Sequence, residues 1–464
     1  MKRAPRRPFL AVALIVVAGT AWAALAPGWT LPVGQIAAAA PGSPAVPNLP
    51  AAGSPSASPG GPSASAGEPS GGPNPTPTFT GTPTPTPTGT PTPTPTPLPV
   101  TIEERRAALS ATLQRLRAAY GIPGISAAMT FPDGTTWVAK AGFADIARHR
   151  VVTPSTEFAA GSISKTFTAT LILRLAEDGR LSLDASVRTY LPKLVIDPGI
   201  TVRQLLDHTS GLDDFFSHAA IDKALLARPA RPWSAADSLK YVAKPYFRPG
   251  AGWHYSNTNY LVLGMVAEAV GRAPLARQLR QAFFDPLGLH DTVYQWVEKP
   301  RGPLAHGYRF SSSNPRQKGI DVSDGTAVIP FTSVVTASGG AGSIATTASD
   351  LVRWARALYG GSVLRPETLA SMVADAATTT ALKSSVPYGL GVQVVTIDGR
   401  QAMGHSGRLL GFRAVMRWLP AEGIAVAVMT NQSRTDPNVL VRDLLRSVIG
   451  VPSPPPCPEC LPQS

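Results

Sequence analysis

The chain has 464 residues, a formal net charge of +13, 48 prolines and two cysteines. Its basic residues are scattered along the chain and do not form a cluster interleaved with aromatic residues. This distribution argues against nucleic-acid binding and favours binding to anionic surfaces such as cell-wall polymers. Cys457 and Cys460 lie in a Pro-rich tail. Two cysteines are too few for a zinc site, so a local disulfide is expected there.

The N-terminus has the composition of an export signal. Basic residues precede an apolar run over residues 9–26, which is typical of a secretory signal peptide, with a cleavage site at Ala21-Trp22-Ala23. The Arg6-Arg7 pair also resembles a twin-arginine export signal. An uncleaved anchor is the alternative, because the run approaches the length of about 18 residues that spans a bilayer. Residues 1–26 are therefore a predicted signal peptide or anchor, and the remainder is expected to be secreted or held in the cell envelope.

Residues 27–100 are expected to be a disordered linker. From Pro41 to Pro99 the composition is dominated by Pro, Ser, Thr, Gly and Ala, with Thr-Pro repeats in the second half. Such a stretch buries too little apolar surface to offset its ordering entropy. Thr-Pro runs favour extended polyproline II, which indicates a stiff spacer. Residues 451–464 form a second Pro-rich tail.

Residues 101–450 are long enough for one large domain or for a domain with a sizeable insertion. Apolar residues at helical spacing predict an opening helix over Thr101–Tyr120. Two strands, Gly124–Thr130 and Thr135–Ala141, are expected on either side of a Pro-Asp-Gly turn.

The middle of this domain is predicted to be helical and its C-terminal part to contain strands. Helices are expected at Thr166–Glu177, within Leu181–Leu191 and Val202–Leu206, and at Ser234–Val242, Leu261–Val270 and Ala348–Leu358. Strands are expected at Gly389–Val395, Ala402–His405, Phe412–Leu419 and Ile424–Thr430, before a closing helix at Val439–Ile449. This order predicts an α/β (α+β) fold with an antiparallel sheet from both chain ends, flanked by helices, and an all-helical lobe. A pocket is expected between the two lobes.

Ser162-Ile163-Ser164-Lys165 stands where a loop is expected to enter the buried helix. Helix positions i and i+3 share a face, so the Ser162 hydroxyl and the Lys165 amine are expected to touch. A serine needs a base to become a good nucleophile, and a desolvated lysine is neutral enough to serve as one. The tetrapeptide alone is a weak signal, because short motifs arise by chance.

Tyr255-Ser256-Asn257 precedes the helix expected at Leu261–Val270. A tyrosine whose pKa is lowered by a nearby lysine can pass a proton to a leaving group. An asparagine can hold a substrate carbonyl or orient the lysine. Taken alone, these residues are better explained by packing of the ring and capping of the helix.

His405-Ser406-Gly407 ends a short predicted strand. A glycine on an edge strand lets a substrate backbone approach closely, and the N–H of the next residue, Arg408, can donate to an oxyanion. Taken alone, His405 is better explained as a partly buried structural residue.

Together and in this order, the three motifs resemble those of the serine β-lactamase and penicillin-binding-protein superfamily. Further runs resemble its class C β-lactamase-related branch, which includes D,D-carboxypeptidases, esterases and D-amino-acid peptidases; they are residues 205–212, 339–343, 347–351 and 388–391. The similarity extends over roughly Glu103 to Asn431. It implies a β-lactamase/transpeptidase-like fold.

The resemblance also implies roles for individual residues. Ser162 would attack a carbonyl and form an acyl-enzyme, and Lys165 and Tyr255 would share general-base and general-acid duty as a coupled pair. Asn257 would hold the substrate amide. The backbone N–H groups of Ser162 and Arg408 would form the oxyanion hole.

The third motif would line the substrate site with His405, Ser406, Gly407 and Arg408. Class C β-lactamases usually carry Lys-Thr-Gly there, and a histidine is more similar to the D,D-peptidase and esterase members. With His405 in place of that lysine, the site lacks a permanent cation that would bind a carboxylate, unless Arg408 supplies one. This departure argues against efficient β-lactam turnover.

The resemblance implies an exported, metal-independent serine hydrolase without a cofactor, and a D,D-carboxypeptidase-like peptidase on cell-wall peptides in particular. An esterase and a β-lactamase are alternatives within the family. A non-catalytic penicillin- or peptidoglycan-binding protein is the alternative from another class, against which the intact catalytic set argues. The expected partners are a small peptide, ester or β-lactam substrate and peptidoglycan, with no nucleic acid, and a membrane only through an uncleaved N-terminal anchor.

Overall fold

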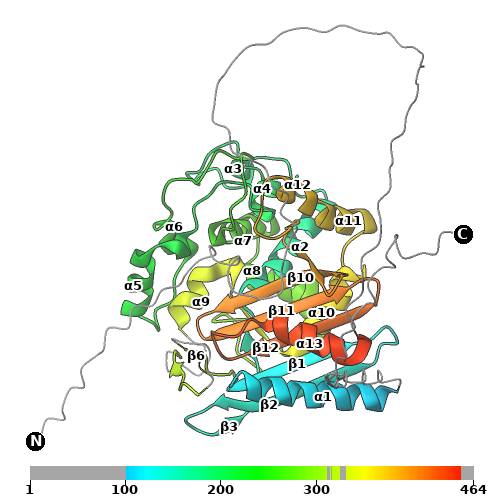
Figure 1. Ribbon diagram of the computed structural model, residues 1–464. Helices are drawn as coiled ribbons and strands as arrows, with labels where there is room; N and C mark the ends of the chain where they lie inside the picture. The colour runs from blue at the N-terminus through cyan, green and yellow to red at the C-terminus, as the bar shows by residue number, and fades with distance from the viewer. Residues whose placement is uncertain (1–100, 311–313, 315, 324–330, 451–464) are drawn as a thin grey trace, which may run out of the picture. The chain divides into compact units, whose positions relative to one another are not determined.

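The computed structural model describes residues 101–310, 314, 316–323 and 331–450; the predicted signal segment, linker and C-terminal tail lie outside them. A seven-stranded antiparallel sheet runs through this folded region in the order β3-β2-β1-β12-β11-β10-β9 (Figure 1). Its strands are β1 (Gly124–Thr130), β2 (Thr136–Asp145), β3 (Arg150–Val151), β9 (Gln393–Ile397), β10 (Arg400–Leu409), β11 (Phe412–Leu419) and β12 (Ile424–Thr430). The prediction that both chain ends build one antiparallel sheet is confirmed.

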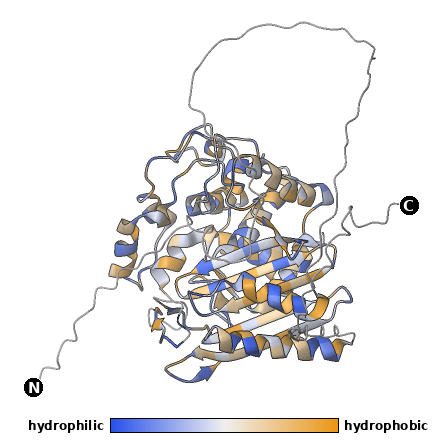
Figure 2. Ribbon diagram, in the orientation of Figure 1, coloured by the Kyte–Doolittle hydropathy of each residue, from blue (hydrophilic) through white to orange (hydrophobic). Residues whose placement is uncertain are grey.

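The two faces of this sheet bury separate clusters, because side chains alternate along each strand. On one face lie α1 (Ile102–Ala119) and α13 (Pro437–Ile449), whose leucines and valines pack with Val426 and Val428 of β12. Figure 2 shows hydrophilic and hydrophobic residues alternating along both helices, which suits elements with one face to water. On the other face, Ala427 and Met429 belong to the larger cluster that continues into the helices.

Most remaining helices gather beyond this second face, as Figure 1 shows. They are α2 (Ser164–Glu177), α3 (Val187–Tyr190), α4 (Val202–Leu206), α5 (Ala219–Ala227), α6 (Ala235–Leu239), α7 (Asn257–Gly271), α8 (Leu275–Leu279), α9 (Thr332–Ser338), α10 (Ala348–Tyr359), α11 (Pro366–Ala374) and α12 (Ala376–Ala381). Short helical turns are η1 (Gly161–Ile163), η2 (Phe215–Ser217), η3 (Arg280–Phe284) and η4 (Gly339–Ala341). Within the described ranges, no helix combines the length and apolar content needed to cross a bilayer.

Two small sheets complete the folded region. One joins β4 (Phe158–Ala159), β8 (Ile344–Thr346) and β5 (Val293–Tyr294), and the other pairs β6 (Tyr308–Arg309) with β7 (Ile320–Asp321). The β4 strand leads directly into η1 and α2, so the three-stranded sheet fixes where the Ser162 turn begins.

Several predicted boundaries were wrong by a few residues. The expected helix Ser234–Val242 is limited to α6, although Ser234 does cap it together with Asp237. The strand expected from Gly389 starts only at Gln393, because Gly391 takes a φ of +84° and turns the chain. The strand expected to end at His405 continues to Leu409, paired with β11.

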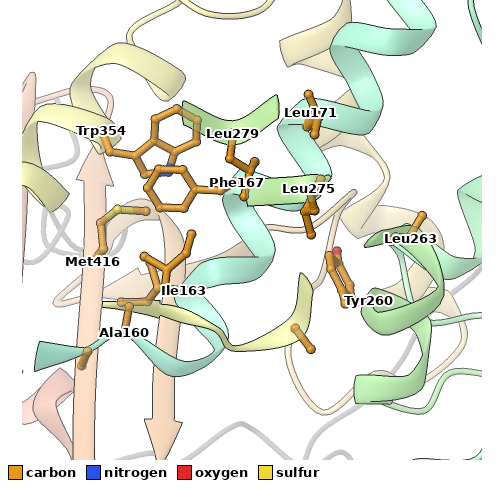
Figure 3. Close-up of a cluster of buried hydrophobic side chains, with 14 of the residues drawn as sticks. Ala160, Ile163, Phe167, Leu171, Tyr260, Leu263, Leu275, Leu279, Trp354 and Met416 are labelled. Carbon is orange, nitrogen blue, oxygen red and sulfur yellow. The ribbon is translucent and has the colours of Figure 1, made fainter. Parts of the chain in front are cut away.

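The helix that carries Lys165 is locked into the core by stacked aromatic rings. Phe167 of α2 stacks on Trp354 of α10, with ring centroids 4.1 Å apart and an interplanar angle of 10° (Figure 3). The indole N–H of Trp354 donates to Thr166 Oγ1 at 2.9 Å, so the polar edge of this fully buried ring is also satisfied. Figure 3 shows Ile163 and Met416 beside the pair, which links α2 to the sheet.

We predict that Trp354→Ala destabilises the protein by about 3–5 kcal/mol, because it opens a cavity and leaves Phe167 without its partner. Urea unfolding followed by circular dichroism measures this loss. Trp296→Ala is the size-matched control, since that tryptophan is 47% exposed, and we expect it to change stability by less than about 0.5 kcal/mol. Equal effects of the two substitutions would contradict this account of the core.

Candidate active site

Ser162 and Lys165 lie at the junction of η1 and α2, with the lysine amine enclosed by three oxygen atoms. Lys165 is fully buried, and its Nζ lies 3.1 Å from Ser162 Oγ, 2.8 Å from Asn257 Oδ1 and 3.0 Å from the carbonyl oxygen of Ala341. A neutral amine has two N–H bonds and one lone pair. The oxygens of Asn257 and Ala341 accept the two N–H bonds, which leaves the lone pair directed at the half-buried Ser162 hydroxyl.

The charge state of Lys165 follows from this enclosure. Burial lowers the pKa of its amine to about 7, while Asp214 opposes the shift by favouring the ammonium form. The rings of Tyr255 and Tyr260, with centroids 4.9 and 5.4 Å from Nζ, complete the surroundings. A substantial neutral fraction therefore exists at neutral pH, and the neutral amine can take the serine proton.

Tyr255 precedes α7, and its ionisation differs from the prediction. We expected a nearby lysine to lower its pKa, but burial of the phenol raises it, and Asp214 raises it further. The hydrogen bond with Ser162 and the charge of Arg408 oppose this shift without reversing it. The desolvation of the phenolate outweighs the nearby cations, so Tyr255 remains a protonated donor that suits the acid role in a pair with Lys165.

Asn257, the first residue of α7, is held between Lys165 and a buried carboxylate. Its Nδ2 lies 3.0 and 3.3 Å from the two oxygens of Asp214, which directs its oxygen at Lys165. Burial raises the pKa of Asp214 to about 6, while its bond from the Phe216 N–H and the charge of Lys165 oppose that shift. The sequence prediction missed Asp214, although it follows the Thr209-Ser210-Gly211-Leu212 run at a separation of two residues.

His208 contacts the Tyr255 ring and holds the start of α7. Its Nδ1 lies 3.2 Å from the Ser256 N–H and 3.0 Å from Asn259 Nδ2, and its ring is 4.3 Å from the Tyr255 ring. Burial holds the pKa of His208 well below its usual range, so the ring stays neutral and accepts both bonds. These contacts give His208 a structural role, which is to hold the start of α7 and the Tyr255 ring in place.

The third motif lies in β10 beyond the end of β9. Pairing between the two strands stops at Gly404 and Gln393, so His405 to Leu409 have no β9 residue opposite them. The expected role of Gly407, to let a substrate backbone approach, stays a prediction. The structure shows a separate need for glycine here, because a Cβ would lie 1.9 Å from the Ala160 carbonyl oxygen. The glycine thus permits the close approach of β10 to the chain that leads into Ser162. The oxyanion-hole role of the Ser162 and Arg408 N–H groups stays a prediction.

His405, predicted to bind substrate, is enclosed. It is 1% exposed, its Nε2 lies 2.9 Å from the Tyr388 hydroxyl, and its Nδ1 lies 2.6 Å from the Ser406 carbonyl oxygen. Burial lowers the pKa of His405 to about 3, and the charge of Lys165 adds to the shift. His405 therefore contributes no cation. Arg408 is exposed and acts electrostatically on Tyr255, so it brings a positive charge to the rim.

Comparisons with known proteins agree with this geometry. A family model described as Beta-lactamase matches residues 109–449. Penicillin-binding protein 4 of Amycolatopsis lactamdurans is 29% identical, over 73% of this chain and 89% of that protein. The D-aminopeptidase of Gluconobacter oxydans is 27% identical, over 75% of this chain but only 63% of that protein.

Solved structures give the same result for the fold. The D-amino acid amidase of Ochrobactrum anthropi SV3 is 25% identical with a TM-score of 0.63, over 74% of this chain and 98% of that one. A D-stereospecific amidohydrolase from Streptomyces is 25% identical with a TM-score of 0.60, over 75% of this chain and 98% of that one. The predicted β-lactamase/transpeptidase-like fold is confirmed.

We predict that the rate of acylation rises with pH through about pH 7, where Lys165 loses its proton. Asp214→Asn removes a negative charge that favours the ammonium form, so this rise should move to lower pH. The profile of kcat/KM for a p-nitrophenyl ester, whose own charge is constant, measures both effects.

Asp184→Asn provides a control, because Asp184 is paired with Arg203 at the surface. Its pH profile should match that of the unaltered protein. A rise that stays in place or moves to higher pH in Asp214→Asn would contradict the proposed coupling between Asp214 and Lys165.

Proposed function

The chain belongs to the beta-lactamase family of serine hydrolases, and we propose that it is an exported D,D-carboxypeptidase-like peptidase acting on cell-wall peptides. The observation that carries the proposal is the Lys165 amine, which lies 3.1 Å from Ser162 Oγ with its pKa lowered to about 7. A base in this state beside a serine hydroxyl serves acyl transfer.

The acylation step follows from these positions. Neutral Lys165 takes the Ser162 proton while Oγ forms a bond to the substrate carbonyl carbon. The C–N bond then breaks, and the leaving amine receives a proton from Tyr255, which is replenished by the Lys165 ammonium. The backbone N–H groups of Ser162 and Arg408 are the proposed oxyanion donors.

Deacylation uses the same groups in reverse. A water molecule gives a proton to the Lys165 and Tyr255 pair while its oxygen bonds to the acyl carbon. The bond between Ser162 Oγ and that carbon then breaks, and Oγ takes the proton back from the pair, which releases the acid and restores the hydroxyl. Asp214 holds the Asn257 amide through Nδ2, and we assign this amide to the carbonyl of the residue on the acyl side of the substrate.

The proposed substrate class has two supports. Relatives carry names that refer to D-amino-acid peptides and amides, among them a D-aminopeptidase and a D-amino acid amidase. The predicted export signal and spacer would place the enzyme where peptides containing D-residues occur. A neutral His405 in place of the usual lysine weighs against the β-lactamase alternative.

We predict that Ser162→Ala abolishes covalent labelling by a fluorescent penicillin or a fluorophosphonate probe, because the nucleophile is gone. In-gel fluorescence measures labelling, and thermal unfolding verifies the fold. Ser447→Ala is the control, since that hydroxyl donates to the Leu444 carbonyl oxygen within α13, and this variant should label fully. Labelling of Ser162→Ala at the unaltered rate would show that another residue is the nucleophile.

We also predict faster turnover of a D-alanyl-D-alanine peptide than of its L,L stereoisomer, a chromogenic cephalosporin or a p-nitrophenyl ester. Comparison of kcat/KM over this panel measures the preference. A preference for the ester or for the cephalosporin would favour the esterase or the β-lactamase. Stoichiometric labelling without turnover of any substrate would favour a non-catalytic binding protein.

A further inference from the structure

The helical lobe has a surface cavity whose lining includes none of the residues assigned to the candidate active site. Its volume is about 320 Å³, which is at the small end of the range for ligand pockets in proteins. It is formed by α5, α6 and the loop between them, together with the residues just beyond α6. Apart from two alanines of α5, it is lined by Arg228, Arg231, Trp233, Asp237, Lys240 and Tyr241.

The loop between α5 and α6 is fixed to α9 at two points. The Ser333 N–H donates to the Pro229 carbonyl oxygen at 2.8 Å. The backbone N–H of Trp233 donates to Thr336 Oγ1 at 2.8 Å. Both α5 and α6 contact α9, and Figure 1 shows the three helices at one side of the helical lobe. The cavity is therefore preformed, so a ligand does not have to order a free loop when it binds.

Three cations surround this cavity and only one carboxylate. Arg231 Nη2 and Lys240 Nζ lie 3.4 and 3.3 Å from the oxygens of Asp237. Arg228 is exposed and forms no ion pair with any acidic side chain in the described ranges. Asp237 also accepts hydrogen bonds from the Ser234 N–H and hydroxyl, so its charge is already shared. Exposed ion pairs contribute little stability, and the excess positive charge is available to an anion.

Two aromatic rings form the apolar part of the cavity. The ring centroids of Trp233 and Tyr241 are 5.6 Å apart, and the Arg231 guanidinium lies 5.8 Å from the Trp233 centroid. Trp233 is 8% exposed, and its indole N–H is buried without an acceptor in the part of the chain that the structure describes. An unsatisfied buried donor is costly. A ligand oxygen that reached it would gain a hydrogen bond without breaking one within the protein.

Cations beside aromatic rings match a ligand that combines an anionic group with a ring. Arginine side chains bind phosphate oxygens through paired N–H groups, and a phosphate monoester carries about −1.5 to −2 charges near neutral pH. A sugar ring has an apolar C–H face, which can pack on an aromatic ring while its hydroxyl groups face water or polar side chains. A sugar that carries a phosphate therefore satisfies both parts of the cavity.

Two other ligand classes fit less well. The fold gathers here a small group of cations and aromatic rings that was not recognised as a cluster from the sequence. A nucleic acid, however, needs a stripe of cations that follows its phosphates, and three cations around one small cavity do not form a stripe. A lipid surface favours apolar side chains that enter the bilayer. None of the large apolar residues that are exposed in the described ranges lines this cavity.

We propose that this cavity is an accessory binding site for a phosphate-bearing saccharide. Arg228, Arg231 and Lys240 supply the positive charge that binds the phosphate, and the sugar ring packs on Trp233 and Tyr241. Binding here requires no acyl transfer, so the site goes beyond the proposed function. Only the choice of cell-wall polymers as the source of the saccharide rests on that function. Such a site holds the enzyme on phosphate-rich wall material.

The first test measures binding of N-acetylglucosamine 6-phosphate by isothermal titration calorimetry. The full-length chain carries Ser162→Ala, so that hydrolysis does not contribute. We expect the sugar phosphate to bind at least about tenfold more tightly than N-acetylglucosamine or inorganic phosphate, because only it contacts both the cations and the rings. Equal affinity for inorganic phosphate would indicate an ion site without saccharide recognition. That result, or the absence of binding, would overturn the proposal.

Matched variants test whether the ligand binds in this cavity. Arg228→Gln combined with Lys240→Gln removes two exposed cations and should weaken binding by about tenfold. Arg188→Gln combined with Lys193→Gln removes the same charge from exposed positions outside the cavity and should leave the affinity unchanged. Tyr241→Leu should reduce the preference for the sugar phosphate over inorganic phosphate. Equal effects of the two double variants, with folding verified by thermal unfolding, would overturn the proposal.

Cell-wall sacculi identify the source of the saccharide. Cosedimentation of the Ser162→Ala protein with sacculi should fall by about tenfold after hydrofluoric acid has removed their phosphate polymers. Undiminished binding to treated sacculi, or stronger binding to phosphatidylglycerol vesicles, would overturn the proposal in favour of peptidoglycan alone or of a lipid surface. Failure of the proposed function would look different, because the unaltered enzyme would not hydrolyse the D-alanyl-D-alanine peptide while these binding results remained the same.

Discussion

The chemistry of this site depends on the burial of the Lys165 amine. Lys165 Nζ is buried among three oxygen atoms and two phenol rings. This burial lowers the pKa of the amine by more than the charge of Asp214 raises it. Several elements meet around that amine. The stacked ring of Phe167 fixes α2, the start of α7 presents Asn257, and η4 presents the Ala341 carbonyl. A polar base inside an apolar core therefore requires that core to be rigid.

Local sequence was sufficient for some of this and not for the rest. The contact between Ser162 and Lys165 follows from helix periodicity, and the sheet follows from alternating strands at both chain ends. The ionisation of Tyr255 could not be predicted, because its cationic neighbours are visible in sequence while its burial is not. Asp214 acts through a contact that depends on tertiary structure, and its partner Asn257 lies 43 residues away. The close approach of Gly407 to Ala160 could not be predicted for the same reason, since the two residues meet only in the folded chain.

The charged groups near Ser162 come from both the helical lobe and the sheet. The helical lobe holds Asp214, which has an anionic form near neutral pH and tunes the base. The sheet holds Arg408, an exposed cation that acts on the Tyr255 phenol, while His405 and His208 remain neutral because both are buried. The base and the acid of the proposed pair are thus each biased by a charge from a different part of the fold, Lys165 by Asp214 and Tyr255 by Arg408.

The contact between β10 and the Ser162 turn bears on how such an enzyme can diversify. At Gly407 and Gly161, backbone meets backbone, and any side chain would collide with the Ala160 carbonyl or with Arg408. Neither position accommodates a side chain, so the backbone alone sets how closely β10 approaches the Ser162 turn. A change of specificity would therefore have to come from side chains around this fixed approach, such as Arg408, and not from a change in the distance between the nucleophile and the strand.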